Sequence, residues 1–206
     1  MLSPFLFTLY IGELVDQLKS TGCQGVYLNE DFPNVFMLLY ADDIDACADT
    51  KVRLQKMIDE VVQDCKCWGL KVNMLKTKIL VFRRGGIINR HENWTFDGML
   101  IEIVNCYKYL GIFFTVKLNW SLAKKTLASQ AKKALNLFQR FRYKCGVLPG
   151  NIANDLFDKT ILPVALYGSE IWGYEYSETI ESVQYKFCRQ TLCVPSNTHK
   201  VHYMVN

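Results

Sequence analysis

Two adjacent aspartates, Asp42 and Asp43, are the residues of this 206-residue chain best suited to chemistry. They directly follow the apolar run 35–41, and neighbouring residues of a strand point to opposite faces, so one carboxylate can face a cleft while the other is turned aside. Hard divalent cations such as Mg²⁺ are held by one or two carboxylates together with substrate phosphates, which suits phosphoryl transfer. An exposed Asp-Asp turn without a ligand is the alternative.

A second group of possible metal ligands lies near the C-terminus. Its members are Cys188, Cys193, His199 and His202, whose spacings match no common zinc finger. We therefore expect no zinc site, and we expect the cysteines to be reduced thiols of an intracellular protein. The apolar segment 5–11 is too short and wrongly flanked for a signal peptide or a membrane span.

The elements that position the aspartates follow from the sequence pattern. The run 35–41 predicts a buried strand, and the alternation of residues 44–49 predicts a second strand after a tight acidic turn. Ser3 before Pro4 predicts the N-cap and the first position of an amphipathic helix. Thr50 predicts the cap of another helix, which we expect to cover one face of a sheet.

Further along the chain, the pattern predicts short strands first and helices later. We expect strands at residues 70–73, 79–83 and 109–115, with Gly111 inside the last, and a two-residue hairpin at residues 95–100. We expect helices at residues 121–144, 152–161 and 177–192, and a strand-like stretch at residues 162–168. The chain is thus predicted to be an α+β part followed by a mainly helical part.

The charges are segregated along the chain. Residues 1–70 carry 5 basic and 11 acidic side chains, residues 71–150 carry 15 and 3, and residues 151–206 carry 4 and 6. The middle segment is therefore strongly basic and can attract a nucleic-acid backbone. A solvated basic face without a ligand is the alternative.

The expected helix at residues 121–144 carries many of these basic residues. Spacings of seven or eight place Lys125, Lys132 and Arg140 near one face of it. Such a helix can lie along a phosphate backbone and bind its shape and charge without base sequence. A solvated amphipathic helix explains the same pattern.

Several short motifs occur in a fixed order along nearly the whole chain. They are Leu2-Ser3-Pro4 with Leu6-Phe7, Tyr40-Ala41-Asp42-Asp43, Gly69-Leu70 with Asn73 and Lys76-Thr77-Lys78, Tyr109-Leu110-Gly111, Leu162-Pro163, Leu166-Tyr167-Gly168, Glu170 and Trp172. In this order they resemble the motifs of reverse transcriptases, and most closely those of the non-LTR (LINE-type) retrotransposon branch.

The resemblance implies an α+β fold. Residues 1–118 would form the C-terminal half of a polymerase palm, including a primer-grip-like strand, and residues 119–206 a mainly helical thumb and C-terminal extension. It implies RNA-directed DNA polymerase activity with Mg²⁺ or Mn²⁺ as cofactor. The partners would be an RNA template paired with a DNA primer and a deoxynucleoside triphosphate, with no membrane.

The resemblance also implies roles for residues of the first motifs. Asp42 would be a metal-binding carboxylate of the palm, Asp43 its weaker neighbour, and Tyr40 would lie under the end of the growing primer. Ser3 and Pro4 match the end of a segment that contacts the template and the incoming nucleotide.

Two later motifs acquire roles in the same way. Asn73 and Lys76 match the segment after the catalytic hairpin, where the lysine would donate a proton to the triphosphate or neutralise its charge. Tyr109, Leu110 and Gly111 match the primer grip, in which a strand glycine permits close approach of another backbone. A solvated loop lysine and an ordinary hairpin glycine are the alternatives.

The family also uses an earlier aspartate, on a strand before Leu2-Ser3-Pro4, and a fingers region, and this sequence contains neither. We therefore expect the chain by itself to be a truncated, inactive polymerase fragment, and the sequence identifies no chain that supplies the fingers. The alternatives are a non-catalytic nucleic-acid-binding module that uses the basic helix, and an inert remnant with an exposed sheet edge.

Overall fold

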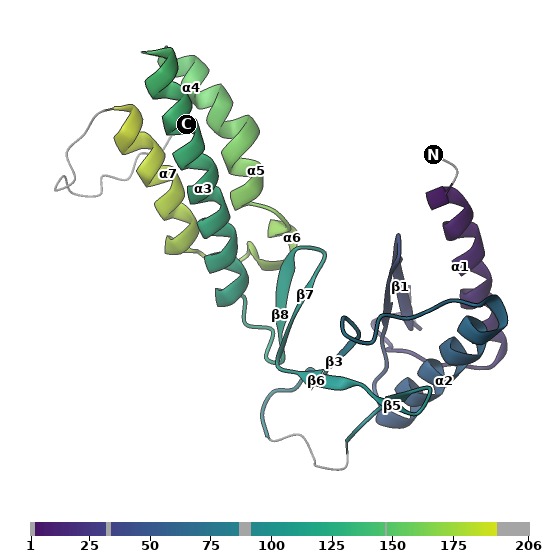
Figure 1. The fold of residues 1–206 in the computed structure, drawn as a ribbon. Coiled ribbons are helices and arrows are strands. Elements are labelled where there is room, and N and C mark those ends of the chain that lie inside the picture. The colour runs from purple at the N-terminus through teal and green to yellow at the C-terminus, as the bar shows by residue number, and fades with distance from the viewer. Residues whose placement is uncertain (1–2, 32–33, 87–91, 147, 193–206) are drawn as a thin grey trace. The chain divides into compact units, whose positions relative to one another are not determined.

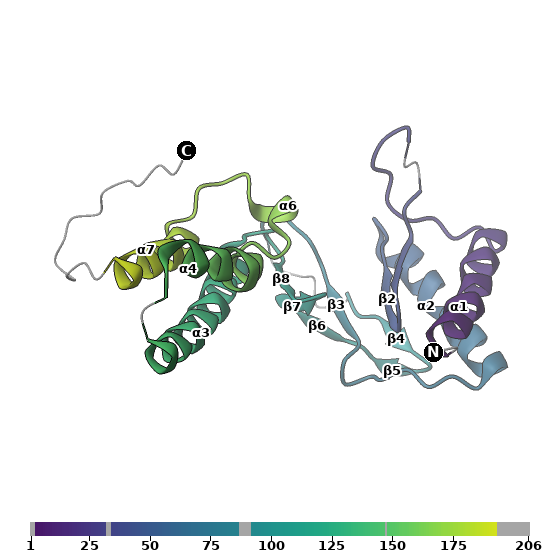
Figure 2. The same cartoon turned by 90° about the horizontal axis from the view of Figure 1, so that it is seen from above.

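The computed structural model describes residues 3–31, 34–86, 92–146 and 148–192. The chain divides into two compact units, residues 1–105 and 106–206, and each is described by itself (Figures 1 and 2). The first unit mixes helices with short strands, and the second is mainly helical with one hairpin. The mixed class predicted from the sequence is therefore confirmed, while the division into palm and thumb stays a prediction.

Two helices form the framework of the first unit, α1 (Ser3–Ser20) and α2 (Lys51–Trp68). Helix α2 begins as predicted, because Oγ1 of Thr50 accepts the N–H of Arg53 at 3.4 Å. It ends at Gly69, whose positive φ of 68° few other residues adopt. The two helices share a core made of Leu14, Leu18, Cys23, Phe36 and Met57.

The strands of the first unit form pairs rather than one wide sheet. Strands β1 (Met37–Tyr40) and β2 (Asp43–Ala46) are antiparallel, as are β4 (Thr95–Phe96) and β5 (Met99–Leu100), whereas β3 (Lys78–Leu80) and β6 (Glu102–Val104) are parallel. The predicted hairpin at residues 95–100 is confirmed, with Asp97 and Gly98 in its turn. A second core joins α2 to these strands and contains Ile58, Val62, Ile79, Trp94 and Ile101.

The prediction that residues 35–41 form a buried strand is right about the strand and wrong about its burial. Phe36 is buried, but Leu38, Leu39 and Tyr40 are 47%, 40% and 61% exposed. The reason is that, among the residues the structure describes, β1 pairs with β2 and no further strand, so that only the start of the hairpin reaches the core of α1 and α2.

The prediction of a strand at residues 70–73 is wrong. The N–H of Leu70 donates to the carbonyl of Cys65 at 2.8 Å, which completes the end of α2. Asn73 then accepts the N–H groups of Lys76 and Thr77 through its own carbonyl, at 3.0 Å each. These local hydrogen bonds use the backbone groups that a strand would need.

The second unit opens with the hairpin of β7 (Cys106–Tyr109) and β8 (Ile112–Thr115) and continues into the long helix α3 (Ser121–Cys145). The later elements are α4 (Gly150–Leu156), the π-helix η1 (Phe157–Ile161), α5 (Leu162–Ala165), α6 (Ser169–Trp172) and α7 (Glu178–Thr191). Helix α3 packs on α7, α5 and η1. Their common core includes Leu127, Ala131, Leu135, Phe157, Ile161, Trp172, Val183 and Phe187.

Two strand predictions fail in this unit. Residues 109–115 are not one strand, because Leu110 and Gly111 form the turn between β7 and β8. Residues 162–168 begin with a helix, α5, rather than a strand. Ile161, just before α5, and Ala165, its last residue, are 0% and 2% exposed and belong to the core shared with α3, so the apolar residues of this stretch pack as a helix and not as a strand.

Candidate functional site

The acidic pair lies at the tip of the β1–β2 hairpin. Tyr40 pairs with Asp43, so the turn consists of Ala41 and Asp42, with Ala41 at a φ of 51°. A two-residue turn of this kind fits the twist of its strands. Tyr40, Asp42 and Asp43 are all exposed. The hairpin therefore presents two carboxylates and one aromatic ring together at its tip, which agrees with the predicted strand, acidic turn and strand.

The donor chemistry of this tip fits a hard divalent cation. Asp42 and Asp43 supply carboxylate oxygens, which Mg²⁺ and Mn²⁺ prefer, and one or two carboxylates suffice when substrate phosphates complete the shell. Asp45 lies two residues from Asp43 and hence on the same face of β2. Within the described residues, no group of three or more His, Cys, Asp or Glu side chains is arranged to hold a metal ion.

The expectation of no zinc site concerns residues that are only partly described. Burial raises the pKa of the Cys188 thiol above its ordinary value. A protonated thiol is a poor zinc ligand, because the thiolate is the ligand form. Cys193, His199 and His202 lie outside the described residues.

Lys76 lies in a turn that Asn73 organises. Oδ1 of Asn73 accepts the N–H groups of Leu75 and Lys76 at 3.1 and 3.3 Å, and its carbonyl accepts the Thr77 hydroxyl at 3.0 Å. The side chain of Lys76 is exposed. Asn73 therefore acts as the structural residue of this motif and Lys76 as the residue that the turn presents.

Ser3 and Pro4 lie in the first turn of α1, where the predicted helix begins. The helix of this motif is confirmed, but it begins at Ser3, which the sequence predicts as the N-cap, and thus one residue earlier than expected. Contacts of Ser3 and Pro4 with template or nucleotide stay a prediction.

The β7–β8 hairpin holds the second group of predicted residues. Tyr109 pairs with Ile112, and the two residues of the turn, Leu110 and Gly111, have φ angles of 44° and 90°. Tyr109 contacts Phe114 edge to face, with ring centroids 6.4 Å apart. Gly111 is a turn glycine, which is the alternative that the sequence left open.

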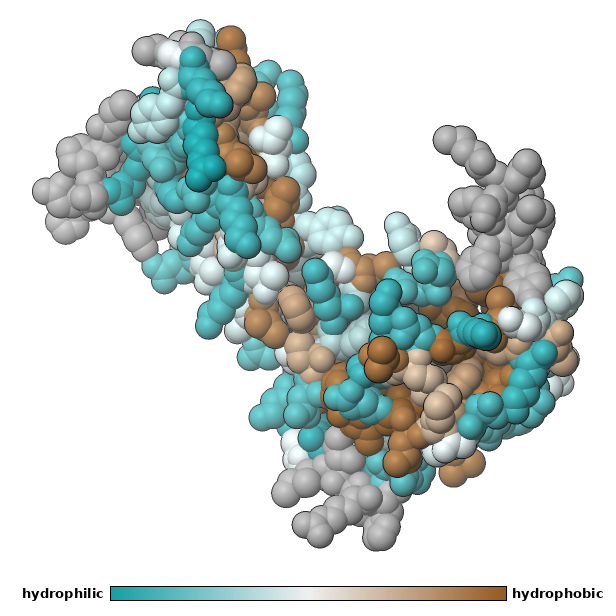
Figure 3. All heavy atoms as spheres, in the orientation of Figure 1, coloured by the Kyte–Doolittle hydropathy of each residue, from teal (hydrophilic) through white to brown (hydrophobic). Residues whose placement is uncertain are grey.

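Helix α3 carries the basic residues that the sequence predicts to contact nucleic acid, Lys125, Lys132 and Arg140. The predicted helix is confirmed, and within it Lys125 and Arg140 are exposed while Lys132 is half-buried. Their contact with nucleic acid stays a prediction. Figure 3 shows hydrophilic side chains over the α3 part of the second unit. Lys124 is not part of this exposed basic surface, since its side chain is 9% exposed and its ammonium pairs with Glu175 at 3.3 Å.

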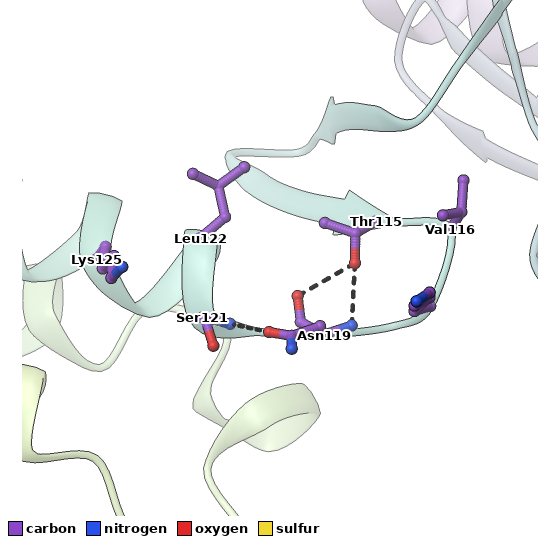
Figure 4. A pocket seen from close by; sticks show the side chains of 7 residues that line it. Thr115, Val116, Asn119, Ser121, Leu122 and Lys125 are labelled. Carbon is purple, nitrogen blue, oxygen red and sulfur yellow. Dashed lines mark hydrogen bonds between the residues drawn. The ribbon is translucent and has the colours of Figure 1, made fainter. Parts of the chain in front are cut away.

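An open hollow of about 390 Å³ lies where β8 leads into α3 (Figure 4). Asn119 shapes its wall, because its N–H donates to Oγ1 of Thr115 at 2.9 Å and its Oδ1 accepts the N–H of Ser121 at 2.8 Å. Lys117 and Lys125 both line the hollow. Lys117 belongs to the basic segment 71–150, but it lies before the predicted helix, so the helical spacing did not identify it.

Three aromatic residues of the second unit differ in their burial. Trp120 and Trp172 lie in the core and are 8% and 2% exposed. Tyr167 is 51% exposed. Its hydroxyl donates to the carbonyl of Leu110 at 2.9 Å, so it belongs with the hairpin turn.

Comparisons with known proteins cover most of the chain. A family model described as "Reverse transcriptase (RNA-dependent DNA polymerase)" matches residues 1–114, just over half of the chain. The chain is 22% identical over 190 residues to "Probable RNA-directed DNA polymerase from transposon BS" of Drosophila melanogaster, covering 89% of this chain and 20% of that protein. It is 29% identical over 141 residues to a Caenorhabditis elegans protein named as uncharacterized and transposon-derived, covering 68% of this chain and 50% of that protein.

The chain therefore spans about a fifth and about a half of the lengths of these two relatives. No solved structure is significantly similar to it. No described helix is long and apolar enough to cross a membrane.

Proposed function

Because the chain belongs to the reverse transcriptase (RNA-dependent DNA polymerase) family, we propose that it is part of a transposon polymerase and carries the acidic catalytic hairpin and a surface for the primer–template duplex. The observation that carries this proposal is the hairpin itself. The family match includes Tyr40, Asp42 and Asp43, and the structure gathers these three residues at one exposed tip. The origin in a LINE-type element is part of the same proposal.

The hairpin would hold the catalytic metal. Asp42 would ligate Mg²⁺ or Mn²⁺ and Asp43 would assist it, while Tyr40 would support the end of the primer. When bound, the metal would neutralise charge on the triphosphate and make the attacking oxygen more nucleophilic. Lys76, presented by its Asn73 turn, would add a positive charge near the triphosphate.

The second unit would hold the duplex of RNA template and DNA primer. Lys125, Lys132 and Arg140 would contact phosphates along α3, and Lys117 would extend this surface into the hollow beside β8. The turn of the β7–β8 hairpin would contact the primer strand. This arrangement recognises charge and shape, which a polymerase that copies any sequence requires.

Paramagnetic broadening by Mn²⁺ tests the metal part of the proposal in the 206-residue chain. We expect Mn²⁺ to broaden the NMR amide signals of residues 40–44, and we expect Asp42→Asn to remove most of that effect. Asp97→Asn is the matched control. Asp97 also lies in a two-residue hairpin turn, but it has no adjacent aspartate and it forms an ion pair with Lys66. Equal broadening at both turns, or none at residues 40–44, would overturn the proposal.

We also propose that residues 1–206 do not polymerise by themselves. Two-metal nucleotide joining needs ligands for two cations, and within the described residues no group of three or more His, Cys, Asp or Glu side chains is arranged to hold a metal ion. A primer-extension assay with Mg²⁺ or Mn²⁺ should therefore show no synthesis. Template-dependent synthesis that Asp42→Asn abolishes would refute this expectation.

The second candidate function is a non-catalytic nucleic-acid-binding module. The exposed cations of α3 favour it, because they need no metal and no fingers to bind phosphates. Duplex binding and Mn²⁺ broadening, measured on the same samples, distinguish the two functions. A non-catalytic module binds duplex but shows no selective Mn²⁺ effect at residues 40–44, whereas the polymerase part shows both.

A further inference from the structure

Tyr167 makes an unusual contact for an exposed tyrosine. It is 51% exposed, yet its hydroxyl donates to the carbonyl of Leu110 at 2.9 Å, across 57 positions of sequence. Its ring also lies against the same turn, since a methyl group at Gly111 would come within 3.1 Å of its Cε1 atom. Tyr167 therefore covers both residues of the β7–β8 turn.

The turn that Tyr167 covers is strained. Leu110 has a φ of 44°, in a region that leucine rarely adopts and that Asn, Asp or Gly adopt far more readily. The turn between β4 and β5 shows the contrast, because there Asp97 and Gly98 take the same positions with favoured residue types. Strained residues persist where surrounding contacts hold them, and such residues concentrate at functional sites.

The segment that carries Tyr167 is itself anchored in the core. The indole N–H of Trp172, which is 2% exposed, donates to the carbonyl of Tyr167 at 3.1 Å. Gly168 has a φ of 65° and packs so closely on Ile112 that a methyl group there would collide with its Cδ1 atom. The turn is thus tied through Tyr167 and Gly168 to the buried part of the helical unit.

We propose that Tyr167 is a positioning residue, which fixes the strained Leu110–Gly111 turn through its hydroxyl so that the β7–β8 hairpin meets the primer strand in one conformation. The proposal rests on the proposed contact between this hairpin and a primer–template duplex. It assigns a role to the Leu166-Tyr167-Gly168 motif, for which the sequence offered none.

Amide hydrogen exchange of the 206-residue chain tests the hydrogen bond. Tyr167→Phe removes only the hydroxyl, and Tyr176→Phe is the matched control, because Tyr176 is 75% exposed and no role is assigned to it. We expect the amides of the Tyr109–Ile112 pair, next to the turn, to exchange about tenfold faster in Tyr167→Phe alone, with similar melting temperatures for both variants. Unchanged exchange in Tyr167→Phe would overturn the proposal.

A rescue variant separates this role from general packing. Asn adopts the left-handed region with little strain and favours such turns, so Leu110→Asn should make the Tyr167 hydroxyl unnecessary. We expect Tyr167→Phe/Leu110→Asn to restore slow exchange at the Tyr109–Ile112 pair. If the double variant exchanges as fast as Tyr167→Phe, strain at Leu110 is not what the hydroxyl controls, and the proposal fails.

Binding of an RNA–DNA hybrid duplex tests the consequence for function. We expect a several-fold weaker affinity for Tyr167→Phe, recovery in the double variant and no change for Tyr176→Phe. Faster exchange with unchanged affinity would overturn the positioning role while leaving duplex binding intact. Absence of binding by the unmodified chain would instead overturn the proposed function and with it this role, whatever the exchange rates.

Discussion

Asp64 is a buried carboxyl of α2 whose ionisation opposes folding of the first unit. It is 5% exposed, and burial, aided by the charge of Glu13, raises the pKa of its carboxyl above the ordinary 3.8, while a hydrogen bond from the Trp68 side chain acts in the opposite direction. A carboxyl with a raised pKa in the folded state weakens that state when it is ionised. Stability is therefore lost as the pH rises from 3.8 through the folded pKa.

Asp64→Asn should remove this loss, because an amide oxygen still accepts the hydrogen bond from Trp68 without carrying a charge. We expect the melting temperature to rise by about 3 °C at pH 7 and the difference to vanish near pH 3. Thermal unfolding followed by circular dichroism at both pH values measures it. The exposed Asp16→Asn is the control, and an equal effect of both variants would contradict the account.

Lys124 shows how neighbouring residues of one helix acquire different roles. Its ammonium pairs with the exposed carboxylate of Glu175 and lies 5.9 Å from the Trp172 ring centroid, while its stem is buried. Such a side chain stabilises mainly through its apolar stem. We expect Lys124→Ala to cost about 2 kcal/mol and Lys124→Met under about 1 kcal/mol in urea unfolding. If Lys124→Ala and Lys124→Met lowered the free energy of unfolding equally, the charge of Lys124 rather than its apolar stem would be the stabilising part.

At the scale of elements, one side chain attaches the β4–β5 hairpin to α2. Nε2 of Gln55 donates to the carbonyl of Thr95 at 2.8 Å, and Oε1 accepts the N–H of Thr95 at 3.0 Å. The amide thus pairs with β4 as a neighbouring strand would. The indole of Trp94 adds a donation to the Lys51 carbonyl at 3.3 Å.

Gln55→Met should leave both backbone groups of Thr95 without this partner and destabilise the first unit by about 2 kcal/mol. Urea unfolding measures the loss, and hydrogen exchange at Thr95 locates it. Gln63→Met, an identical change at an exposed position of the same helix, should cost little. The attachment would be disproved if the two variants unfolded alike.

The elements that local chemistry defines were predictable from the sequence. The Thr50 cap, the Asp97-Gly98 turn and the apolar stripe of α3 each act within a few residues, so their patterns suffice. The failures depend on distant partners. The exposure of Leu38 and Leu39 reflects the lack of further strands beside β1 among the described residues.

The candidate site likewise has features that the local sequence predicts and features that depend on distant contacts. The acidic turn at Asp42 follows from the run of apolar residues before it, and the basic face of α3 from its spacing. The hydrogen bond from Tyr167 to Leu110 joins residues 57 positions apart, which no local pattern encodes. Helical spacing already places Lys125 rather than Lys124 on the face of Lys132 and Arg140. The ion pair of Lys124 with Glu175, 51 positions away, is what no local pattern encodes.

At the scale of the whole molecule, the account depends on the charge that α3 presents to a polyanion. A chain of formal charge +4 binds duplex by salt-sensitive contacts only if its cations are exposed and gathered together. Lys124 and Lys125 are adjacent in α3, and only Lys125 is exposed. Replacing either lysine by methionine lowers the net charge by one, so the two variants differ only in which cation is lost.

The most direct measurement is the salt dependence of binding to an RNA–DNA hybrid duplex by the unmodified chain, Lys125→Met and Lys124→Met. We expect a steep loss of affinity with salt, a slope in log–log form reduced by about one for Lys125→Met, and an unchanged slope for Lys124→Met. Binding that ignores salt, or an equal change of slope in both variants, would contradict the account.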